Sequence, residues 1–292
     1  MNVKLAIAPI AWTNDDLPKL GGDTPVELCL SQIQQSGFVG TELGGKFPQK
    51  KEELKAILNK YNLELAGGWF SGLLLDLSLG EEKVRLEEEF IKRKFVDSKI
   101  IVYCECSNTI QGEIDTPLSK KVVLSQKQMQ EYAKRFSELS EFAKQKGFIL
   151  AYHHHMGTII QNEDELDSFL KYASKDVKIT FDSGHLYFAG ANPLEVLKKH
   201  YEHIIHVHLK DIREDIKTQV KKEDLSFLNS VLLGVFTIPG DGAINFKDII
   251  DFLKQKSYSG WLVVEAEQDP KLAPPLEYAK KAYDYLQTLL KD

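Results

Sequence analysis

Four stretches of the sequence place histidine or carboxylate side chains within or directly after short apolar runs. The stretches read AYHHH at 151–155, TFDSGH at 180–185, HVHLKD at 206–211 and VVEAE at 263–267. Imidazole nitrogens and carboxylate oxygens are ligands for divalent transition metals. If one such group from each stretch reaches a common point, the four form a mixed nitrogen and oxygen site for a metal ion.

The spacing within these stretches selects which side chains can point to the same place. Successive side chains of a β-strand point to opposite faces. His206 and His208 therefore share one face. In the triplet, His153 and His155 share a face that His154 does not, so either of them could be the ligand, with His153 preferred. The predicted metal ligands are His153, Asp182, His208 and Glu265.

Two imidazoles and two carboxylates without a thiolate favour Mn2+, Co2+, Fe2+ or Zn2+, with coordination positions left for a substrate. A simpler explanation exists for each residue taken alone. A single histidine at a strand end is usually hydrogen-bonded in the core or at the rim, and a single aspartate there often caps a helix. Such groups at the ends of four successive strands favour one metal site over four separate explanations.

These side chains need a scaffold that brings strand ends together, and the rest of the sequence predicts one. Short β-rich runs alternate with longer amphipathic helical runs, which is typical of a parallel sheet with crossover helices. We predict an α/β fold, a single-domain (β/α)8 TIM barrel over residues 1–292. The expected strands are Lys4–Pro9, Phe38–Glu42, Leu63–Trp69, Lys99–Tyr103, Phe148–His153, Val177–Asp182, Ile204–Leu209 and Trp261–Glu265.

Helices are expected between the strands, and two of them carry clear end signals. Thr24 is the expected cap of the first, with Pro25 in its first turn. Another helix is expected over Ser125–Lys146, with Gly147 as its stop signal. The remaining helices are expected at Gln49–Tyr61, Glu81–Phe95, Glu163–Ala173, Pro193–His200, Phe246–Lys256 and Pro275–Leu290.

One long connection is expected over residues 210–245. It holds a charged stretch, a short apolar piece and the turn sequence IPGDG at 238–242. Long connections in compact domains are usually lids or binding loops, and this one leaves the carboxyl end of the seventh strand, where TIM barrels place their active sites. We therefore expect a loop over the barrel mouth, although a solvated charged excursion explains its charged half equally well.

Composition and charge limit the partners. The formal net charge of −6 argues against nucleic acid or an anionic membrane surface, because both need a concentrated positive field. The three cysteines, Cys29, Cys104 and Cys106, do not form a disulfide framework, so a cytoplasmic location is expected. The sequence contains no recognisable export signal or apolar run near 20 residues. A small polar metabolite fits as substrate, and a homo-oligomer is compatible with the sequence.

The motifs resemble those of a known group of proteins. The stretches FDSGH at 181–185, HVHLKD at 206–211 and VEAEQDP at 264–270 resemble the xylose-isomerase-like barrel superfamily, whose metal is held by groups from these same strand ends. Together with APIAWTNDDLP at 8–18, GGDTP at 21–25, GTELGGKFP at 40–48 and MGT at 156–158, they resemble the inosose dehydratase family within it. These motifs span nearly the whole chain.

The resemblance implies that Asp182, His208 and Glu265 are metal ligands and that the strand-five position completes the set. It implies removal of water from 2-keto-myo-inositol, a small polyhydroxylated cyclic ketone, to give a trihydroxycyclohexane-dione in myo-inositol catabolism. Mn2+ or Co2+ is placed first as the metal, and glutathione is a further cofactor that the family suggests. Related keto-sugar isomerases and epimerases carry a glutamate where this chain has His153. Such an activity on the same barrel is therefore the alternative interpretation.

Proton transfer needs further residues. His185 is the first candidate for the acid–base group, because related barrel dehydratases place a histidine there and imidazole titrates near neutrality. A rim histidine explains it equally well. Glu42 and Glu105, expected at the ends of strands two and four, are candidates for a second proton-transfer group or for loop salt bridges.

Segments expected at the barrel mouth supply candidate contacts to the hydroxylated ring of the substrate. Basic side chains there could donate hydrogen bonds and tryptophan rings could pack on the ring face, although aromatic residues are more often part of a core. The candidates for substrate binding are Trp12, Lys46, Trp69, His155 and Arg213.

Overall fold

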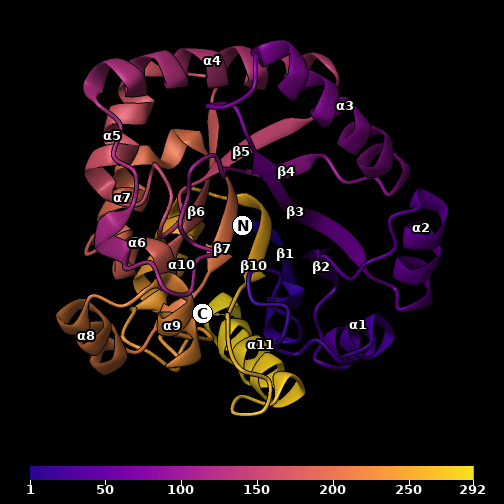
Figure 1. Cartoon of the computed structure of the whole chain (residues 1–292). Helices are drawn as coiled ribbons and strands as arrows, with labels where there is room; N and C mark the ends of the chain where they lie inside the picture. The colour runs from indigo at the N-terminus through magenta and orange to yellow at the C-terminus, as the bar shows by residue number, and fades with distance from the viewer. Residues whose placement is uncertain (292) are drawn as a thin grey trace.

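The chain forms a closed barrel of eight parallel strands in a computed structural model, which describes residues 1–291 (Figure 1). Around the barrel the strands follow the order β1-β10-β7-β6-β5-β4-β3-β2, so neighbours in the barrel are consecutive barrel strands of the chain. The predicted eight-stranded barrel is confirmed. Its strands are β1 (Asn2–Ile7), β2 (Gly40–Leu43), β3 (Glu64–Gly72), β4 (Ile100–Glu105), β5 (Ile149–His153), β6 (Lys178–Asp182), β7 (Ile204–Leu209) and β10 (Ser259–Val264).

The parallel register places the carboxyl ends of neighbouring strands side by side. Asp182 of β6 pairs with His208 of β7, and His208 pairs with Val263 of β10. Glu265 follows Val263 by two residues, so its side chain leaves the strand on the same face. Three of the predicted metal ligands therefore lie along one edge of the barrel because of backbone register alone.

Helices surround the barrel on its outside (Figure 1). Of those within residues 1–291, none combines the length and apolar character that a bilayer crossing requires. The helices that follow the first six barrel strands are α1 (Val26–Gln35), α2 (Lys51–Lys60), α3 (Leu79–Phe95), α4 (Gln126–Gln145), α5 (Glu163–Tyr172), α6 (Ser183–Phe188) and α7 (Pro193–His200). After β7 come α8 (Glu214–Glu223), α9 (Phe227–Leu232), α10 (Phe246–Gln255) and α11 (Pro275–Lys291). Short 3-10 turns are η1 (Pro9–Ala11), η2 (Leu118–Lys120) and η3 (Tyr201–His203).

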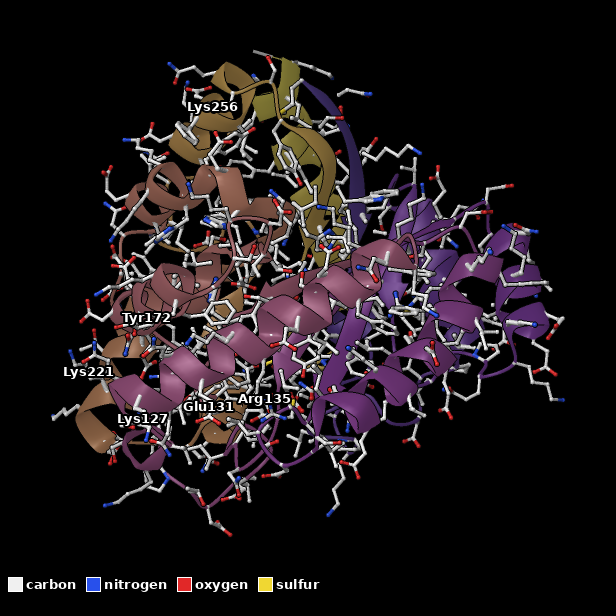
Figure 2. The ribbon with its side chains drawn as sticks, turned by 90° about the horizontal axis from the view of Figure 1, so that it is seen from above. Lys127, Glu131, Arg135, Tyr172, Lys221 and Lys256 are labelled. Carbon is white, nitrogen blue, oxygen red and sulfur yellow. The ribbon has the colours of Figure 1, made fainter. Side chains whose placement is uncertain are left out.

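In helix α4, the capping residues and the apolar stripe of the sequence determine where the helix begins and ends and which face it buries. Ser125 caps it through a reciprocal pair of bonds with Gln128, and Gly147 has a positive φ of 87° just after its end, as its stop signal predicts. Its inner face buries an apolar stripe, whereas Figure 2 shows charged side chains along its outer length. The buried stripe is Met129, Tyr132, Ala133, Phe136, Leu139 and Ala143, and the labelled outer residues are Lys127, Glu131 and Arg135.

Two local expectations differ from the structure. Pro25, and not Thr24, occupies the N-cap position of α1, which begins at Val26 with no side-chain cap bond. The short helix α6 directly after β6 was not expected, because six residues are too few to show a helical period. Asp182 caps α6 through a bond from the backbone N of His185, so this residue ends a strand and starts a helix at once.

The connection over 210–245 contains secondary structure in place of a continuous loop. Beside α8 and α9 it forms a small antiparallel pair, β8 (Asp211–Ile212) with β9 (Phe236–Thr237). Asp211 fixes the turn sequence by accepting backbone N–H bonds from Gly240, Gly242 and Ile244. The segment is therefore anchored to the end of β7.

Small side chains fill part of the barrel interior, whereas aromatic side chains pack outside it. Ala6, Ala8, Ala66 and Val263 form an inner cluster, against which Trp261 packs. Between barrel and helices, aromatic rings contact one another with centroids 4.7 to 6.4 Å apart, at Tyr103, Tyr132, Phe136, Tyr152 and Phe169. This packing holds the strand ends in fixed positions.

Candidate metal centre and active site

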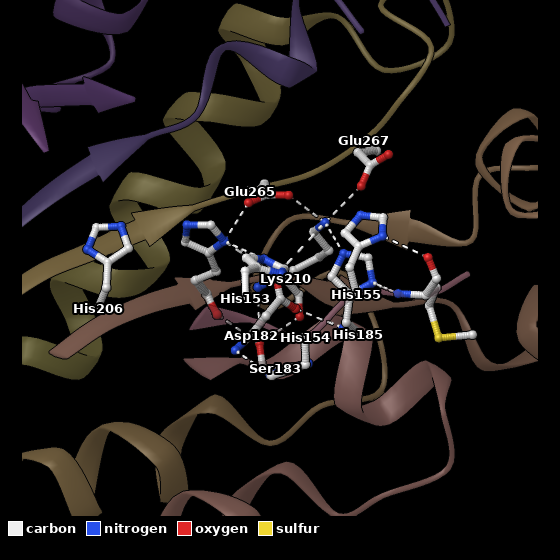
Figure 3. A network of polar contacts seen from close by, with 12 residues as sticks. His153, His154, His155, Asp182, Ser183, His185, His206, Lys210, Glu265 and Glu267 are labelled. Atoms are coloured by element: carbon white, nitrogen blue, oxygen red, sulfur yellow. Dashed lines mark hydrogen bonds and ion pairs between the residues drawn. The ribbon is translucent and has the colours of Figure 1, made fainter. Parts of the chain in front are cut away.

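Four side chains from neighbouring strands converge at the carboxyl end of the barrel (Figure 3). One ligand atom from each lies within 4.8 Å of the others, and all four side chains are buried. They come from the ends of β5, β6 and β7 and from the residue that follows β10. The four are His153, Asp182, His208 and Glu265, so the structure brings together the residues predicted as metal ligands.

Asp182 divides its carboxylate oxygens between a helix and this cluster. Its Oδ1 accepts the backbone N–H of His185 at 2.8 Å. Its Oδ2 is buried and has no hydrogen-bond partner within residues 1–291. This oxygen lies 3.7 Å from Nε2 of His153 and 3.6 Å from Nδ1 of His208. Because a buried polar atom without a partner is costly, Oδ2 fits the role of a metal ligand.

The distances among the four groups suit ligands of one ion. Two ligands at about 2.1 Å from a transition metal ion lie roughly 3 to 3.5 Å apart. Nε2 of His153 lies 3.2 Å from Nδ1 of His208, which in turn lies 2.6 Å from Oε2 of Glu265. Two nitrogens and two oxygens without sulfur can hold Mn2+, Co2+, Fe2+ or Zn2+. The residues present therefore fit a divalent cation.

His208 uses its two ring nitrogens in opposite directions. Nδ1 faces the cluster, and Nε2 lies 3.2 Å from the Glu42 carboxylate, which also binds Nε2 of His206 at 2.7 Å. Burial alone would lower the pKa of His208, but the charges of Glu42 and Glu265 raise it well above its usual value. Carboxylates behind metal-binding histidines orient the ring, and Glu42 has this position.

Lys210 connects the cluster to a second group of buried side chains. Its Nζ lies 2.6 Å from Oε1 of Glu265, 2.9 Å from Oε1 of Glu267 and 3.1 Å from Nε2 of His185. An ammonium group has three N–H donors, so these contacts use all of them. Burial alone would lower the pKa of Lys210, but the two glutamates raise it, so the group stays charged. Burial raises the pKa of Glu267 to about 7, against the opposing charge of Lys210.

Two imidazoles lie in contact beside Lys210, with the ring centroids of His155 and His185 3.9 Å apart. Nδ1 of His155 lies 2.8 Å from the carbonyl oxygen of Met156, which assigns the proton to Nδ1 and the lone pair to Nε2. Burial, with nearby positive charge, holds the pKa of both histidines well below the usual value. Both rings are therefore neutral at neutral pH.

Helix α9 and strand β9 cover this histidine pair. The ring of Phe227 on α9 lies 4.8 Å from that of His155 and 6.0 Å from that of His185. The ring of Phe236 lies 5.3 Å from that of His185 and 4.6 Å from Nζ of Lys210. The segment 210–245 therefore keeps water from one side of the site.

A pocket at the barrel mouth reaches these groups. Trp69 forms part of its wall, with its ring centroid 5.5 Å from that of His155 and its Nε1 donating to Oγ of Ser71 at 2.8 Å. His185 is fully buried and lies behind His155, outside the pocket lining. The polar side chains that line the pocket are Asp15, Asp16, Glu42, His155, His208, Glu265 and Glu267.

The structure places three predicted substrate contacts away from this pocket. Trp12 is buried, and its Nε1 donates to Oε1 of Gln32 at 2.7 Å. The ammonium of Lys46 donates to the carbonyl oxygens of Gly22 and Thr24. Arg213 donates to the carbonyl oxygens of Gly234 and Phe236 and forms an ion pair with Asp241. Within residues 1–291 these groups fix the loops around the mouth.

Glu105 lies at the end of β4, and its carboxylate binds backbone N–H groups. Its carboxylate accepts N–H bonds from Leu74, Leu75 and Ser107 at 3.0, 3.4 and 3.1 Å. Burial raises its pKa, and the bonds from Ser107 oppose that shift. In this position Glu105 holds two loops together and does not line the pocket.

Four residues of the site were not singled out from the sequence. Strand alternation places His206 on the face of His208, and Lys210 and Glu267 each follow a ligand by two residues, but alternation gives the direction of a side chain and not its role. Asp16 lies in an irregular segment between η1 and α1, where no periodicity predicts a direction.

Comparison with known proteins agrees with this architecture. The family model described as xylose isomerase-like TIM barrel matches residues 30–289. An inosose dehydratase of Clostridium tetani is 45% identical over 291 residues, which cover 98% of this chain and 96% of that protein. An inosose dehydratase of Bacillus thuringiensis is 46% identical with the same coverage. A rhizopine catabolism protein, MocC of Rhizobium meliloti, is 42% identical over 98% of this chain and 88% of that protein.

Solved structures show the same fold at low sequence identity. The probable 3-DHS dehydratase AsbF of Bacillus anthracis superposes with a TM-score of 0.70 at 16% identity, covering 97% of this chain and 98% of that one. The IolI protein with a bound zinc atom superposes with a TM-score of 0.65 at 16% identity, covering 98% and 96%. With the fold, the buried ligand set and the full-length relatives together, the chain belongs to the xylose isomerase-like TIM barrel family and, within it, to the inosose dehydratases.

Proposed function

We propose that this protein is a metal-dependent hydro-lyase that removes water from an inosose, a polyhydroxylated cyclic ketone. The named relatives, which match over nearly the full chain, support the reaction class. The proposed substrate is 2-keto-myo-inositol, the product a trihydroxycyclohexane-1,2-dione, and the setting myo-inositol catabolism in the cytoplasm. The observation that carries the proposal is the buried set of two imidazoles and two carboxylates, of which His208 and Glu265 line the pocket.

A divalent cation would be held by His153, Asp182, His208 and Glu265. When bound, it supplies Lewis-acid stabilisation of the negative charge that develops on the ketone oxygen. Mn2+ or Co2+ is placed first, and the donor set also accepts Zn2+ or Fe2+. Glu42 would act on this site from behind, by fixing the ring of His208 through Nε2.

His155 is the best-placed base for the proton of the carbon next to the ketone. It lines the pocket, and its hydrogen bond to the Met156 carbonyl leaves a lone pair on Nε2. A positioned base contributes about 10²- to 10⁴-fold to the rate. His185, which the sequence favours for this role, lies in contact with His155 on the side away from the pocket and is bonded to Lys210. We propose that His185 positions His155.

Hydroxyl groups of the substrate match the acidic lining of the pocket. Carboxylates accept hydrogen bonds from hydroxyls, and Glu267 lines the pocket. The ring of Trp69 offers an apolar face for the carbon skeleton of the substrate. The bonds of Trp12, Lys46 and Arg213 within the protein support an indirect role, in which they shape the mouth of the barrel.

One reconstitution experiment tests the proposal. Protein stripped by a chelator is incubated with 2-keto-myo-inositol, with Mn2+, Co2+, Zn2+ or Mg2+ added back, and with or without glutathione. We expect no turnover without metal and, with metal, a conjugated product that absorbs in the ultraviolet and has lost one water by mass spectrometry. A product of unchanged mass would instead identify a ketose isomerase or epimerase. Turnover that survives complete metal removal would defeat the metal assignment.

A further inference from the structure

Asp16 is a pocket carboxylate without a hydrogen-bond or ion-pair partner among residues 1–291. It lies in the irregular segment between η1 and α1, next to Asp15, and both residues line the pocket. The neighbouring Asp15 accepts the backbone N–H of Gly45 at 2.9 Å. Within residues 1–291, by contrast, no hydrogen bond or ion pair reaches the side chain of Asp16. The sites on its two oxygens are therefore free for a ligand.

The surroundings of Asp16 favour its protonated form. Burial and the charge of Asp15 raise the pKa of Asp16 to about 6, and the ammonium of Lys210 opposes this shift. A carboxyl group with this pKa carries a proton for part of the time at neutral pH. The charged and titratable groups that face it are Asp15 on its own segment, Lys210 after β7, Glu265 and Glu267 after β10, and the Cys104 thiol on β4.

Elimination of water needs a proton donor as well as a base. Lys210 directs its three N–H donors at protein acceptors, and Glu267 is held by one of them through Oε1, while its Oε2 has no partner within residues 1–291. His155 holds its ring proton on Nδ1, in a bond to a backbone carbonyl. Among the described pocket residues whose pKa is raised, Asp16 is the carboxyl group that has no protein partner on either oxygen, whereas Glu267 is tied to Lys210.

We propose that Asp16 is the catalytic acid that protonates the departing hydroxyl of the substrate, an inference that rests on the proposed dehydration. In this step the base takes the proton from the carbon next to the ketone, and the electron pair of that C–H bond forms the new C=C bond. The C–O bond to the β-hydroxyl breaks, and its electron pair stays with the oxygen. That oxygen receives the proton of Asp16 and leaves as water. Asp16 remains as a carboxylate and is reprotonated from solvent.

A substrate analogue distinguishes a role of Asp16 as catalytic acid from a role in substrate binding alone. In the analogue, fluoride replaces the departing hydroxyl and leaves as an anion without a proton. For the metal-loaded enzyme with the hydroxyl substrate, we expect Asp16→Asn to lower kcat by about 10²- to 10⁴-fold. With the fluoro analogue, the kcat of the same variant should stay within about tenfold of that of the unsubstituted enzyme. This decrease is smaller than the one expected when a catalytic acid is missing. The matched control is Asp23→Asn, an exposed aspartate of the same segment, which should leave both rates unchanged.

The pH profile gives a second readout. Because the protonated carboxyl is the donor, kcat for the hydroxyl substrate should fall as pH rises through the pKa of Asp16, and the fluoro analogue should lack this dependence. Asp16→Glu keeps an acid and should retain more activity than Asp16→Asn. Equal losses of Asp16→Asn on both substrates, or full activity on the hydroxyl substrate, would overturn the proposal. An unsubstituted enzyme that dehydrates no inosose would instead defeat the proposed function.

Discussion

At the scale of single residues, the site is organised by side chains that bond in two directions. Asp182 caps α6 with one oxygen and offers the other to the cluster. His208 faces the cluster with Nδ1 and Glu42 with Nε2. Because the second bond of each side chain fixes its orientation, the geometry of the cluster is set before any ion binds.

The contact of Glu42 with His208 leads to a specific prediction. In Glu42→Gln the amide oxygen can still accept one hydrogen bond, but the negative charge that faces His206 and His208 is lost. We expect metal affinity, measured by titration against a competing chelator, to fall about 10- to 100-fold. The control Glu64→Gln on β3 removes an exposed ion pair with Lys4 of β1 and should leave the affinity unchanged. An unaltered affinity in Glu42→Gln would show that the carboxylate does not orient the ligand.

Side-chain direction explains which site residues the sequence could predict. The positions of Asp182, His208 and Glu265 could be predicted from the sequence, because strand alternation and parallel register decide where these side chains point. The contacts of Trp12 and Arg213 could not be predicted from the sequence, because long side chains at a loop can turn back onto the protein. Asp16 was missed for a related reason, since no repeating backbone geometry governs its segment.

At the scale of elements, the segment between β7 and α10 acts as a cover. Helix α9 brings the ring of Phe227 against His155 and His185, and β9 brings Phe236 against Lys210. The low dielectric that results strengthens every charge interaction in the site. The sequence predicted a connection at this place, but not its two helices and short strand pair. Helix α9 and the two strands are too brief to show a period, and the ten-residue α8 buries only Val220, so it has no apolar stripe.

A pair of matched variants tests the cover. Phe227 on α9 and Phe246 on α10 are both fully buried, but the ring contacts of Phe227 include His155 and His185. Phe227→Leu and Phe246→Leu should each lower the free energy of unfolding by about 1 to 2 kcal/mol. Phe227→Leu should also lower kcat/KM by about tenfold or more, because a displaced base loses its alignment. Steady-state kinetics beside urea unfolding checks this, and equal kinetics in both variants would exclude a role of α9 at the site.

The larger elements were well predicted for a simple physical reason. All eight barrel strands and the long helices, such as α4, follow from hydrophobic period and end signals, which the sequence states directly. The predictions were wrong at short or irregular segments of the chain. Pro25, and not Thr24, is the N-cap residue of α1, and the six-residue helix α6 after β6, which Asp182 caps, was not predicted.

At the scale of the whole molecule, the site buries several charged side chains close together inside the barrel. Lys210 is fully buried, and several buried carboxylates surround it. Ligands that bind only the folded state stabilise it by mass action. A cation bound at this cluster should therefore stabilise the entire barrel, because its ligands come from four neighbouring strands.

The stabilisation has a predictable size. At a free metal concentration about 100 times the dissociation constant, the free energy of unfolding should rise by about 2.7 kcal/mol. Asp182→Asn should lose this increase, while its amide oxygen can still cap α6. Urea unfolding at fixed metal concentration measures both proteins. An equal metal-dependent rise in Asp182→Asn would show that the ion binds elsewhere.

The central claim concerns the position of one ion, and anomalous diffraction from crystals of the Co2+-loaded protein tests it most directly. The account predicts a single strong peak at about 2.0 to 2.3 Å from ligand atoms of His153, Asp182, His208 and Glu265. Two other groups of buried side chains could hold an ion, namely Glu42, His206 and His208, and His155, His185 and Glu267. A principal peak at either of these groups, or no peak within the barrel, would contradict the account.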